Sequence, residues 1–213
     1  MTDNLTLERA RPADDPALRP TTAKRGAIAG LTLLLGGAAL FGPSLVTSDV
    51  DMTMSMGMTH YMELLAANQP RNLLLFMGVP VLLAETLAIT ELALLVKRDR
   101  PAWVRGLNHV AGLLAGPVMV GIFLHLLLNA VAPLTLGGGW RGPADVLAVL
   151  FYLSGAIPFV GITLVELGFL ASTQQQATRL RALLISVFLV VAHVAMVFGM
   201  LDPAVLGYVM QHH

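Results

Sequence analysis

The chain has no cysteine among its 213 residues. That absence excludes a disulfide framework, thiolate metal sites and a catalytic thiol, so any bound metal would need methionine, histidine, carboxylate or backbone ligands. Charged residues are also scarce at 12%, whereas a soluble domain is typically about one quarter charged. With 56% hydrophobic residues and a mean hydropathy of +0.74, the composition places the chain among membrane proteins.

Motifs of the familiar enzyme and nucleotide-binding classes are also missing. The sequence contains no Walker loop, no dinucleotide fingerprint, no His-Glu-x-x-His and no nucleophile elbow. Basic residues form no patch beyond the flanks of apolar segments, so nucleic acid is not an expected partner. No internal repeat supports an inverted-repeat transporter. These absences favour a non-enzymatic role, with a redox subunit as the enzymatic alternative.

Five apolar segments are long enough to cross a bilayer. A helix rises 1.5 Å per residue, so about 20 apolar residues span a hydrocarbon core of about 30 Å. The segments lie at about residues 26–47, 73–96, 102–134, 144–171 and 182–201. The predicted fold class is therefore all-α, a polytopic membrane protein with a bundle of five transmembrane helices within residues 26–205. Residues 1–25 are predicted to form a disordered cytoplasmic tail. Residues 48–70 are predicted to form an outer loop, and residues 206–213 a short outer tail.

The basic residues are distributed unequally between the two ends of these segments. On one side lie only Arg71 and Arg141. The other side holds the remaining eleven, which are Arg9, Arg11, Arg19, Lys24, Arg25, Lys97, Arg98, Arg100, Arg105, Arg179 and Arg181. The positive-inside rule places these eleven in the cytoplasm. The sequence thus predicts a protein of the bacterial cytoplasmic membrane, N-terminus inside and C-terminus outside. Its partners are the lipid bilayer and, because five helices enclose little volume, a second copy or a partner subunit.

A stretch rich in methionine and histidine occupies the predicted outer loop. It contains Met52, Met54, Met56, Met58, His60 and Met62, and the outer C-terminal tail adds Met210, His212 and His213. Thioether sulfur is a soft donor, so clustered methionine beside histidine suits Cu(I) better than a hard cation. The stretch predicts an outer copper-binding face. The alternative is that methionines at alternate positions only supply apolar surface to an interfacial segment.

Ionisable residues inside the predicted membrane helices form a second candidate site. Each costs about 2.5–3.5 kcal/mol on insertion scales, so each is a functional hypothesis. Counted from the cytoplasmic flanks, an inner tier lies about 6–9 Å deep, a middle tier lies about 18 Å deep, and one histidine lies further out. The inner tier consists of Glu91, His109 and Glu166, and the middle tier consists of Glu85 and His193. The histidine that lies further out is His125.

These tiers predict a proton or cation path across the membrane, in which Glu85 and His193 share a proton. For the inner tier, the competing interpretation is that the side chains reach lipid headgroups. For Glu85 and His193, it is a structural hydrogen bond between two helices.

A haem b centre is the alternative use of the membrane histidines. Bis-histidine ligation needs two histidines on different helices at one depth. His125 and His193 are the available pair, with Gly121 and Ala192 as small neighbours. Residue counting separates the pair by about 9–12 Å in depth, which disfavours the haem. It remains the alternative, as part of a haem or copper redox subunit that passes electrons to quinone.

A short interfacial helix is predicted from Thr59 to Ala67, with Thr59 as its N-cap and Asn68-Gln-Pro70 closing it. The run Thr59-His-Tyr-Met-Glu-Leu-Leu-Ala-Ala-Asn-Gln-Pro-Arg-Asn-Leu-Leu-Leu-Phe76, continuing to Pro80 and Ala84-Glu-Thr86, resembles an uncharacterised bacterial multi-pass family sometimes labelled permease. The resemblance covers residues 59–86 and implies membrane residence, without a substrate. The expected function is a small permease-like protein that handles copper or a proton-coupled solute.

Overall fold

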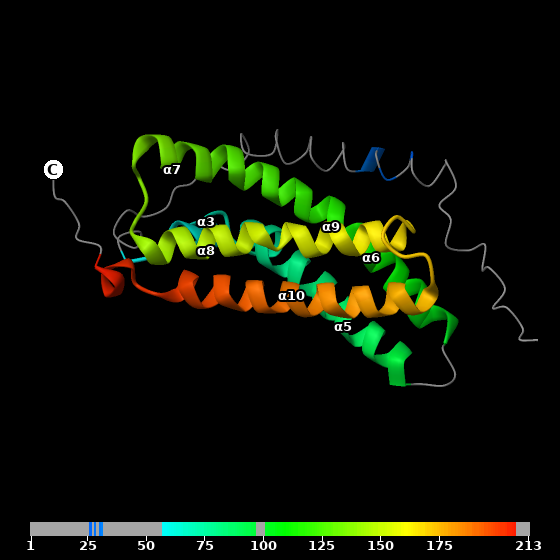
Figure 1. The fold of residues 1–213 in the computed structure, drawn as a ribbon. Coiled ribbons are helices and arrows are strands. Elements are labelled where there is room, and N and C mark those ends of the chain that lie inside the picture. The colour runs from blue at the N-terminus through cyan, green and yellow to red at the C-terminus, as the bar shows by residue number, and fades with distance from the viewer. Residues whose placement is uncertain (1–25, 27, 29, 32–56, 97–100, 208–213) are drawn as a thin grey trace, which may run out of the picture.

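The computed structural model describes residues 26, 28, 30, 31, 57–96 and 101–207 (Figure 1). Within these residues the secondary structure is helical, with no strand. Of the first predicted span at 26–47, only the helical positions 26, 28, 30 and 31 are described. The predicted tail at 1–25 lies outside the described residues, as do residues 208–213 of the C-terminal tail.

Four helical runs are long and apolar enough to cross a membrane. Arg71–Val96 contains α4 (Arg71–Leu73), the π-helix η3 (Leu74–Gly78) and α5 (Val79–Val96). Ala102–Gly137 contains α6 (Ala102–Leu126), the π-helix η4 (Leu127–Val131) and α7 (Ala132–Gly137). Pro143–Glu166 contains α8 (Pro143–Ser154) and α9 (Ala156–Glu166), and the last run is α10 (Gln174–Met200). The all-helical class is confirmed and the four runs indicate a membrane protein, while the count of five spans stays a prediction.

Two predicted boundaries shift in the loop between α9 and α10. The span predicted to reach residue 171 ends at Glu166, and Gly168 then turns the chain with a φ of 74°. The last helix begins at Gln174, eight positions before the predicted residue 182. The first turns of this helix are polar, so a prediction based on apolar length does not include them. The Thr173 side chain caps the helix by accepting a hydrogen bond from the Gln176 N–H.

The short helix predicted from Thr59 to Ala67 is present as α3 (His60–Ala66), while its place at a membrane interface stays a prediction. The Thr59 hydroxyl caps it by accepting from the Met62 N–H at 3.4 Å and donates to the Gly199 carbonyl at 2.8 Å. Because Gly199 belongs to the last turn of α10, one hydroxyl both starts α3 and ties it to α10. The 3₁₀ helix η5 (Pro203–Leu206) follows α10 at the same end.

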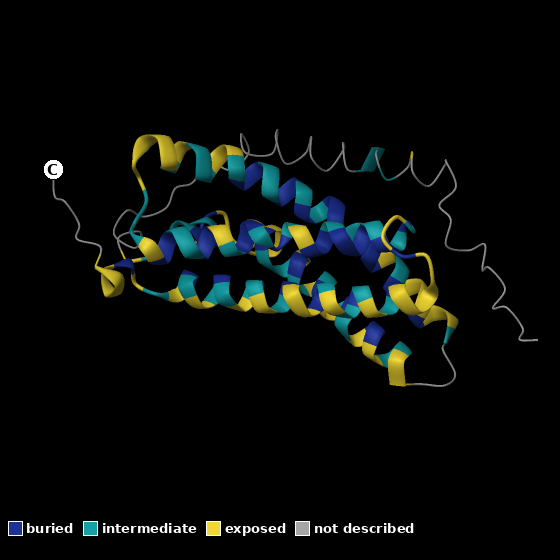
Figure 2. Ribbon diagram, in the orientation of Figure 1, coloured by how far each residue is buried: buried dark blue, intermediate teal, exposed yellow. Residues whose placement is uncertain are grey.

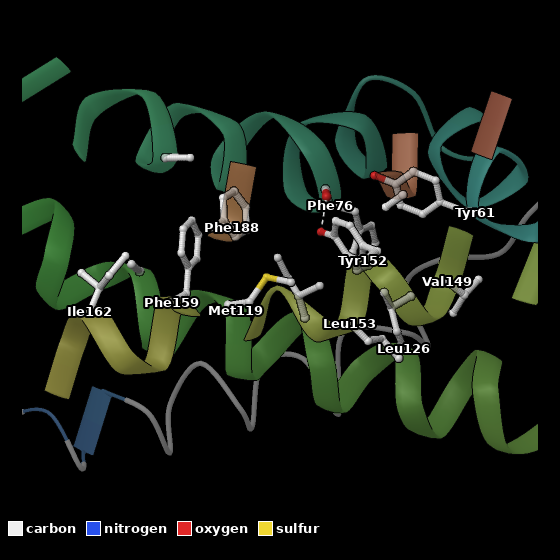
Figure 3. Close-up of a cluster of buried hydrophobic side chains, with 14 of the residues drawn as sticks. Tyr61, Phe76, Met119, Leu126, Val149, Tyr152, Leu153, Phe159, Ile162 and Phe188 are labelled. Carbon is white, nitrogen blue, oxygen red and sulfur yellow. Dashed lines mark hydrogen bonds between the residues drawn. The ribbon is translucent and has the colours of Figure 1, made fainter. Parts of the chain in front are cut away.

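The core lies where α10 runs along α8 and α9, and where α6 packs against α9 (Figure 1). It holds the large buried side chains Tyr61, Phe76, Met119, Tyr152, Phe159, Ile162 and Phe188 (Figure 3). Phe159 and Phe188 stack with ring centroids 3.9 Å apart, which joins α9 to α10. The core therefore fills the middle of the bundle with apolar and aromatic side chains.

Exposed positions run along both α5 and α10 (Figure 2), and large apolar side chains occupy many of them. These side chains include Leu82, Ile89, Leu92, Leu183, Val190 and Val197. A helix that is apolar on its buried and exposed faces alike is typical of a membrane span. The surface therefore agrees with the length and composition of the four runs.

Two glycines allow α9 to approach the backbone of α6. A Cβ at Gly112 would lie 2.7 Å from the Glu166 Cγ, and one at Gly116 would lie 2.6 Å from the Thr163 Oγ1. Because neither clash exists, the Thr163 hydroxyl accepts from the Gly116 N–H at 2.8 Å and donates to the Gly112 carbonyl at 2.7 Å. The small-xxx-small spacing on the third predicted span is thus a close-packing contact.

A proline in α5 leaves a backbone carbonyl without its usual helical hydrogen-bond donor, and a side chain of another helix donates to it. Pro80 has no N–H to bond the carbonyl four residues earlier, which belongs to Phe76. The buried Tyr152 hydroxyl on α8 donates to that carbonyl instead (Figure 3). This follows the rule that backbone groups freed inside a membrane are bonded by neighbouring helices.

Tyr152→Phe should therefore lower the free energy of unfolding by about 1–3 kcal/mol, the cost of leaving a buried acceptor without a donor. Unfolding in mixed detergent micelles measures the change. In a Pro80→Ala background a backbone N–H is restored, so Tyr152→Phe should then cost less. The same cost in both backgrounds would contradict this role for Tyr152.

Candidate functional site

A buried aspartate orders the end of the bundle at which α3 and α8 meet. Asp145 lies in the first turn of α8 and is fully buried. Its Oδ1 accepts from the His60 backbone N–H at 2.7 Å, and its Oδ2 accepts from the His60 Nδ1 at 2.5 Å and the Arg141 backbone N–H at 3.0 Å. Because Nδ1 is bound, the His60 ring has a fixed orientation with Nε2 as its remaining nitrogen.

Arg141 connects the same end to the start of α3. Its Nη2 lies 2.8 Å from the Glu63 Oε2, and its Nη1 donates to the Met58 carbonyl at 2.8 Å. The side chains of Arg141 and Glu63 are 19% and 25% exposed, so the ion pair is only partly desolvated. Gly142, with a φ of 85°, and Pro143 then start α8 directly behind this arginine.

A cavity of about 390 Å³ lies beside these two pairs and is called the outer pocket here. Its polar lining consists of His60, Glu63, Asn72, His125, Asn129 and Arg141. Its apolar lining includes Tyr61, Leu64, Leu126, Ala130, Pro133 and Val149. Burial raises the pKa of Tyr61 to about 12, so its phenol stays neutral. The pocket therefore combines charged, hydrogen-bonding and apolar surfaces.

The opposite end of the bundle holds a buried ion cluster to which four helices contribute. The Arg181 guanidinium on α10 lies between two carboxylates, with Nε 3.3 Å from the Glu91 Oε2 and Nη1 2.5 Å from the Glu166 Oε1. The His109 Nδ1 on α6 lies 2.7 Å from the Glu166 Oε2. The Asn108 amide donates to the Glu91 Oε2 at 3.1 Å. We call these five residues the inner cluster.

The inner cluster is closed to solvent except at one edge. Glu91 is 3% exposed and Arg181 is 7% exposed, while the His109 side chain is 43% exposed. A buried charge is tolerated only when it is paired and hydrogen-bonded. Glycine at position 112 helps to bring the two sides together, because it lets Glu166 lie directly on α6.

Residues 56–213 match DUF6803, a family of unknown function. The chain belongs to this family. No curated protein and no solved structure matches the chain. The expected membership of an uncharacterised family is therefore supported, while the permease label and the bacterial origin stay predictions.

The inner tier that residue counting predicts in this DUF6803 member does assemble. Glu166 contacts His109 directly, and Glu91 is joined to Glu166 through Arg181. The sequence assigned Arg181 only to the topology charges and gave Asn108 no role. A signal for Arg181 was present, because it lies two helical turns inside the N-terminus of α10 and near the level of two acidic membrane residues.

The structure does not bring the middle tier together. Glu85 is exposed on α5 and His193 is exposed on α10, and no hydrogen bond joins them. The His193 Nδ1 instead donates to the Leu189 carbonyl on its own helix at 2.6 Å. Equal depth was their only link, and depth does not fix the direction in which a side chain leaves its helix.

The two histidines considered for haem also differ in their surroundings. His125 is 8% exposed and packs on Phe76 with ring centroids 5.2 Å apart. It lines the outer pocket, whereas His193 lies on the exposed face of α10. The arrangement therefore adds no support to the haem alternative.

The predicted copper ligands fall largely beyond the described part of the chain. Met52, Met54, Met56, Met210, His212 and His213 lie outside the described residues. Met58 and Met62 are partly buried, and His60 is bound to Asp145. Within the described residues, no group of three or more His, Asp or Glu is arranged to hold a metal ion. Copper binding therefore stays a prediction.

Removing the arginine of the inner cluster should be severely destabilising. Arg181→Met leaves Glu91 and Glu166 facing each other without a cation, and breaking a buried pair costs about 3–5 kcal/mol. Arg179→Met is the matched control, because Arg179 is exposed two positions earlier on α10. Unfolding in detergent micelles should separate the two variants, and equal losses would contradict a paired role for Arg181.

Proposed function

We propose that the protein is a small permease-like carrier of the bacterial cytoplasmic membrane that binds a small polar solute in the outer pocket. The observation that carries the proposal is the contrast between the two ends of the bundle. One end has a cavity lined by ionisable side chains, and the other is closed by the inner cluster. A carrier that is open at one end and closed at the other needs both features.

One continuous helical run connects the two ends. The run Ala102–Gly137 carries Asn108 in the inner cluster and His125 in the outer pocket. At 1.5 Å per residue, these two positions are about 25 Å apart along the run. The apolar core with Met119 and Phe159 lies between them and blocks a polar path through the bundle. Transport would therefore require the helices to rearrange.

The helices beside the pocket have the features expected of hinges. The π-helix η4 contributes Asn129 and Ala130 to the pocket lining, and the π-helix η3 begins two residues after Asn72. π-helical turns inside α-helices are rare and often mark functional sites. Pro80 and Pro133 follow the two π-helices, and each removes one backbone hydrogen bond. We infer that the pocket opens and closes at these turns.

The lining of the pocket indicates the solute class. Glu63 and Arg141 supply opposite charges, while Asn129 and the two histidines supply hydrogen-bonding groups. A small solute with donor and acceptor groups, such as a zwitterion, fits within about 390 Å³ and would bind by exchanging contacts with these groups. The predicted orientation, with the N-terminus in the cytoplasm and the C-terminus outside, has this pocket facing outward.

Filling the pocket should block transport. Ala130→Trp places an indole in the cavity, whereas the control Ala102→Trp places it at the exposed start of the same helical run. The measurement is accumulation of radiolabelled amino acids, amines and organic acids by proteoliposomes under a pH gradient. We expect wild type and Ala102→Trp to accumulate at least one solute, and Ala130→Trp to lose at least nine tenths of that rate. Uptake unchanged by Ala130→Trp, or none in wild type, contradicts the carrier.

Copper handling is a second candidate, supported by the His60–Asp145 pair. Histidines that bind metals almost always donate their other ring nitrogen to a carboxylate or carbonyl, which orients the ring. The His60 Nδ1 donates to the Asp145 carboxylate in this way, so Nε2 is the nitrogen available to a metal. Met58 and Met62 flank His60 at two positions on either side and offer soft thioether donors.

His60→Gln should then weaken Cu(I) binding at least tenfold, while His193→Gln should leave it unchanged because His193 is far along α10 and bonded to its own helix. Competition with a Cu(I)-selective chromophoric chelator measures the affinity in detergent. Equal affinities in wild type and His60→Gln would remove copper from the proposal and leave the solute carrier.

A further inference from the structure

Within the part of the chain that the structure describes, one carboxylate oxygen of the inner cluster has no hydrogen-bond partner. Both oxygens of Glu166 are engaged, one by Arg181 at 2.5 Å and the other by His109 at 2.7 Å. The Glu91 Oε2 is also engaged, by Asn108 and Arg181. The Glu91 Oε1 is buried without any hydrogen-bond donor. The two glutamates are thus unequal, although they share one arginine.

The charges of the cluster are unequal in number as well. Two carboxylates face one guanidinium, and among the described residues the only other ionisable group in contact is His109. An ionised carboxylate needs donors at both oxygens when it is buried, because the interior does not replace its lost hydration. Glu166 meets this requirement and Glu91 does not. Neutralising Glu91 would leave Glu166 and Arg181 as one balanced pair.

We propose that Glu91 binds a proton at Oε1, while Glu166 stays ionised between Arg181 and His109. The surroundings of Glu91 are Thr90 on its own helix, Asn108 on α6 and Arg181 on α10. A metal cation is a poor alternative occupant of this site, because the positive charge of Arg181 would repel it. The oxygen is also sealed from solvent, which suits a proton rather than a hydrated ion.

The proton site gives the inner cluster a way to open. With a neutral Glu91, Arg181 is held by Glu166 alone, and the link between α5 and α10 is weakened. When Glu91 loses the proton, its carboxylate attracts Arg181 and draws α5 towards α10. The coupling of this step to a solute rests on the proposed function, and it would make the proton the coupling ion. The proton on Glu91 itself does not depend on transport.

Infrared absorption of the purified protein in lipid nanodiscs tests the assignment without a solute. A protonated carboxyl group has a C=O stretch that is distinct from the carboxylate bands and that shifts in D₂O. We expect wild type to show such a band, to lose it as the pH is raised, and to lack it at every pH in Glu91→Gln. His109→Gln should retain the band. Glu166→Gln should show it at low pH but lose it at a lower pH than wild type, because Arg181 then has Glu91 as its carboxylate partner. Glu85→Gln is the matched control on the same helix, and it should retain the band assigned to Glu91.

The outcome that overturns the proposal is a Glu91→Gln protein with the band unchanged, or a Glu166→Gln protein that lacks the band at every pH. Should Glu91→Gln fail to fold, the Glu166→Gln spectrum still decides, because the band must be present there at low pH if the proton is on Glu91. Uptake assays separate the two proposals. If wild type takes up a solute but the band does not depend on Glu91, only the proton site is contradicted. If the band depends on Glu91 but wild type takes up no solute, only the carrier is contradicted.

Discussion

The structure depends above all on how a single positive charge is accommodated inside an apolar bundle. Arg181 is nearly fully buried, and a guanidinium in such surroundings must be paired. Its partners come from α5 and α9, and α6 supplies Asn108 and His109, which bond one oxygen of each carboxylate. The charge therefore sets the relative depth of four helices. Close packing around it is possible only because Gly112 leaves room for Glu166.

The same constraint takes a different form at the opposite end. Asp145 is fully buried, and it is bonded by the backbone N–H groups of His60 and Arg141 and by the His60 ring. These contacts fix His60 and the start of α3 beside a cavity instead of closing one. Between the ends, Tyr152 and Thr163 bond backbone atoms of α5 and α6, so the apolar core has few unsatisfied polar groups. The two ends therefore differ in structure, with a cavity at one and a buried ion cluster at the other.

Much of the fold could be predicted because membrane helices follow from apolar length, and the N-cap at Thr59 follows from local chemistry. The inner tier could be predicted because depth along a helix is countable. What depth cannot supply is direction around the helix axis, and for that reason Glu85 and His193 do not meet. Asp145 was missed because it stands at a helix start, where an acidic residue is ordinary, and its partner His60 is distant in sequence.

The central claim is that the outer pocket is accessible from outside while the inner cluster is closed. The natural absence of cysteine allows this to be measured with single-cysteine variants and a membrane-impermeant thiol reagent on intact cells. Ala130→Cys in the pocket should be labelled from outside. Ala111→Cys, buried one turn from Asn108 on the same helical run, should be labelled from neither side until the protein is unfolded. Labelling of Ala130→Cys only after permeabilisation, or of Ala111→Cys in the folded protein from outside, would contradict the account.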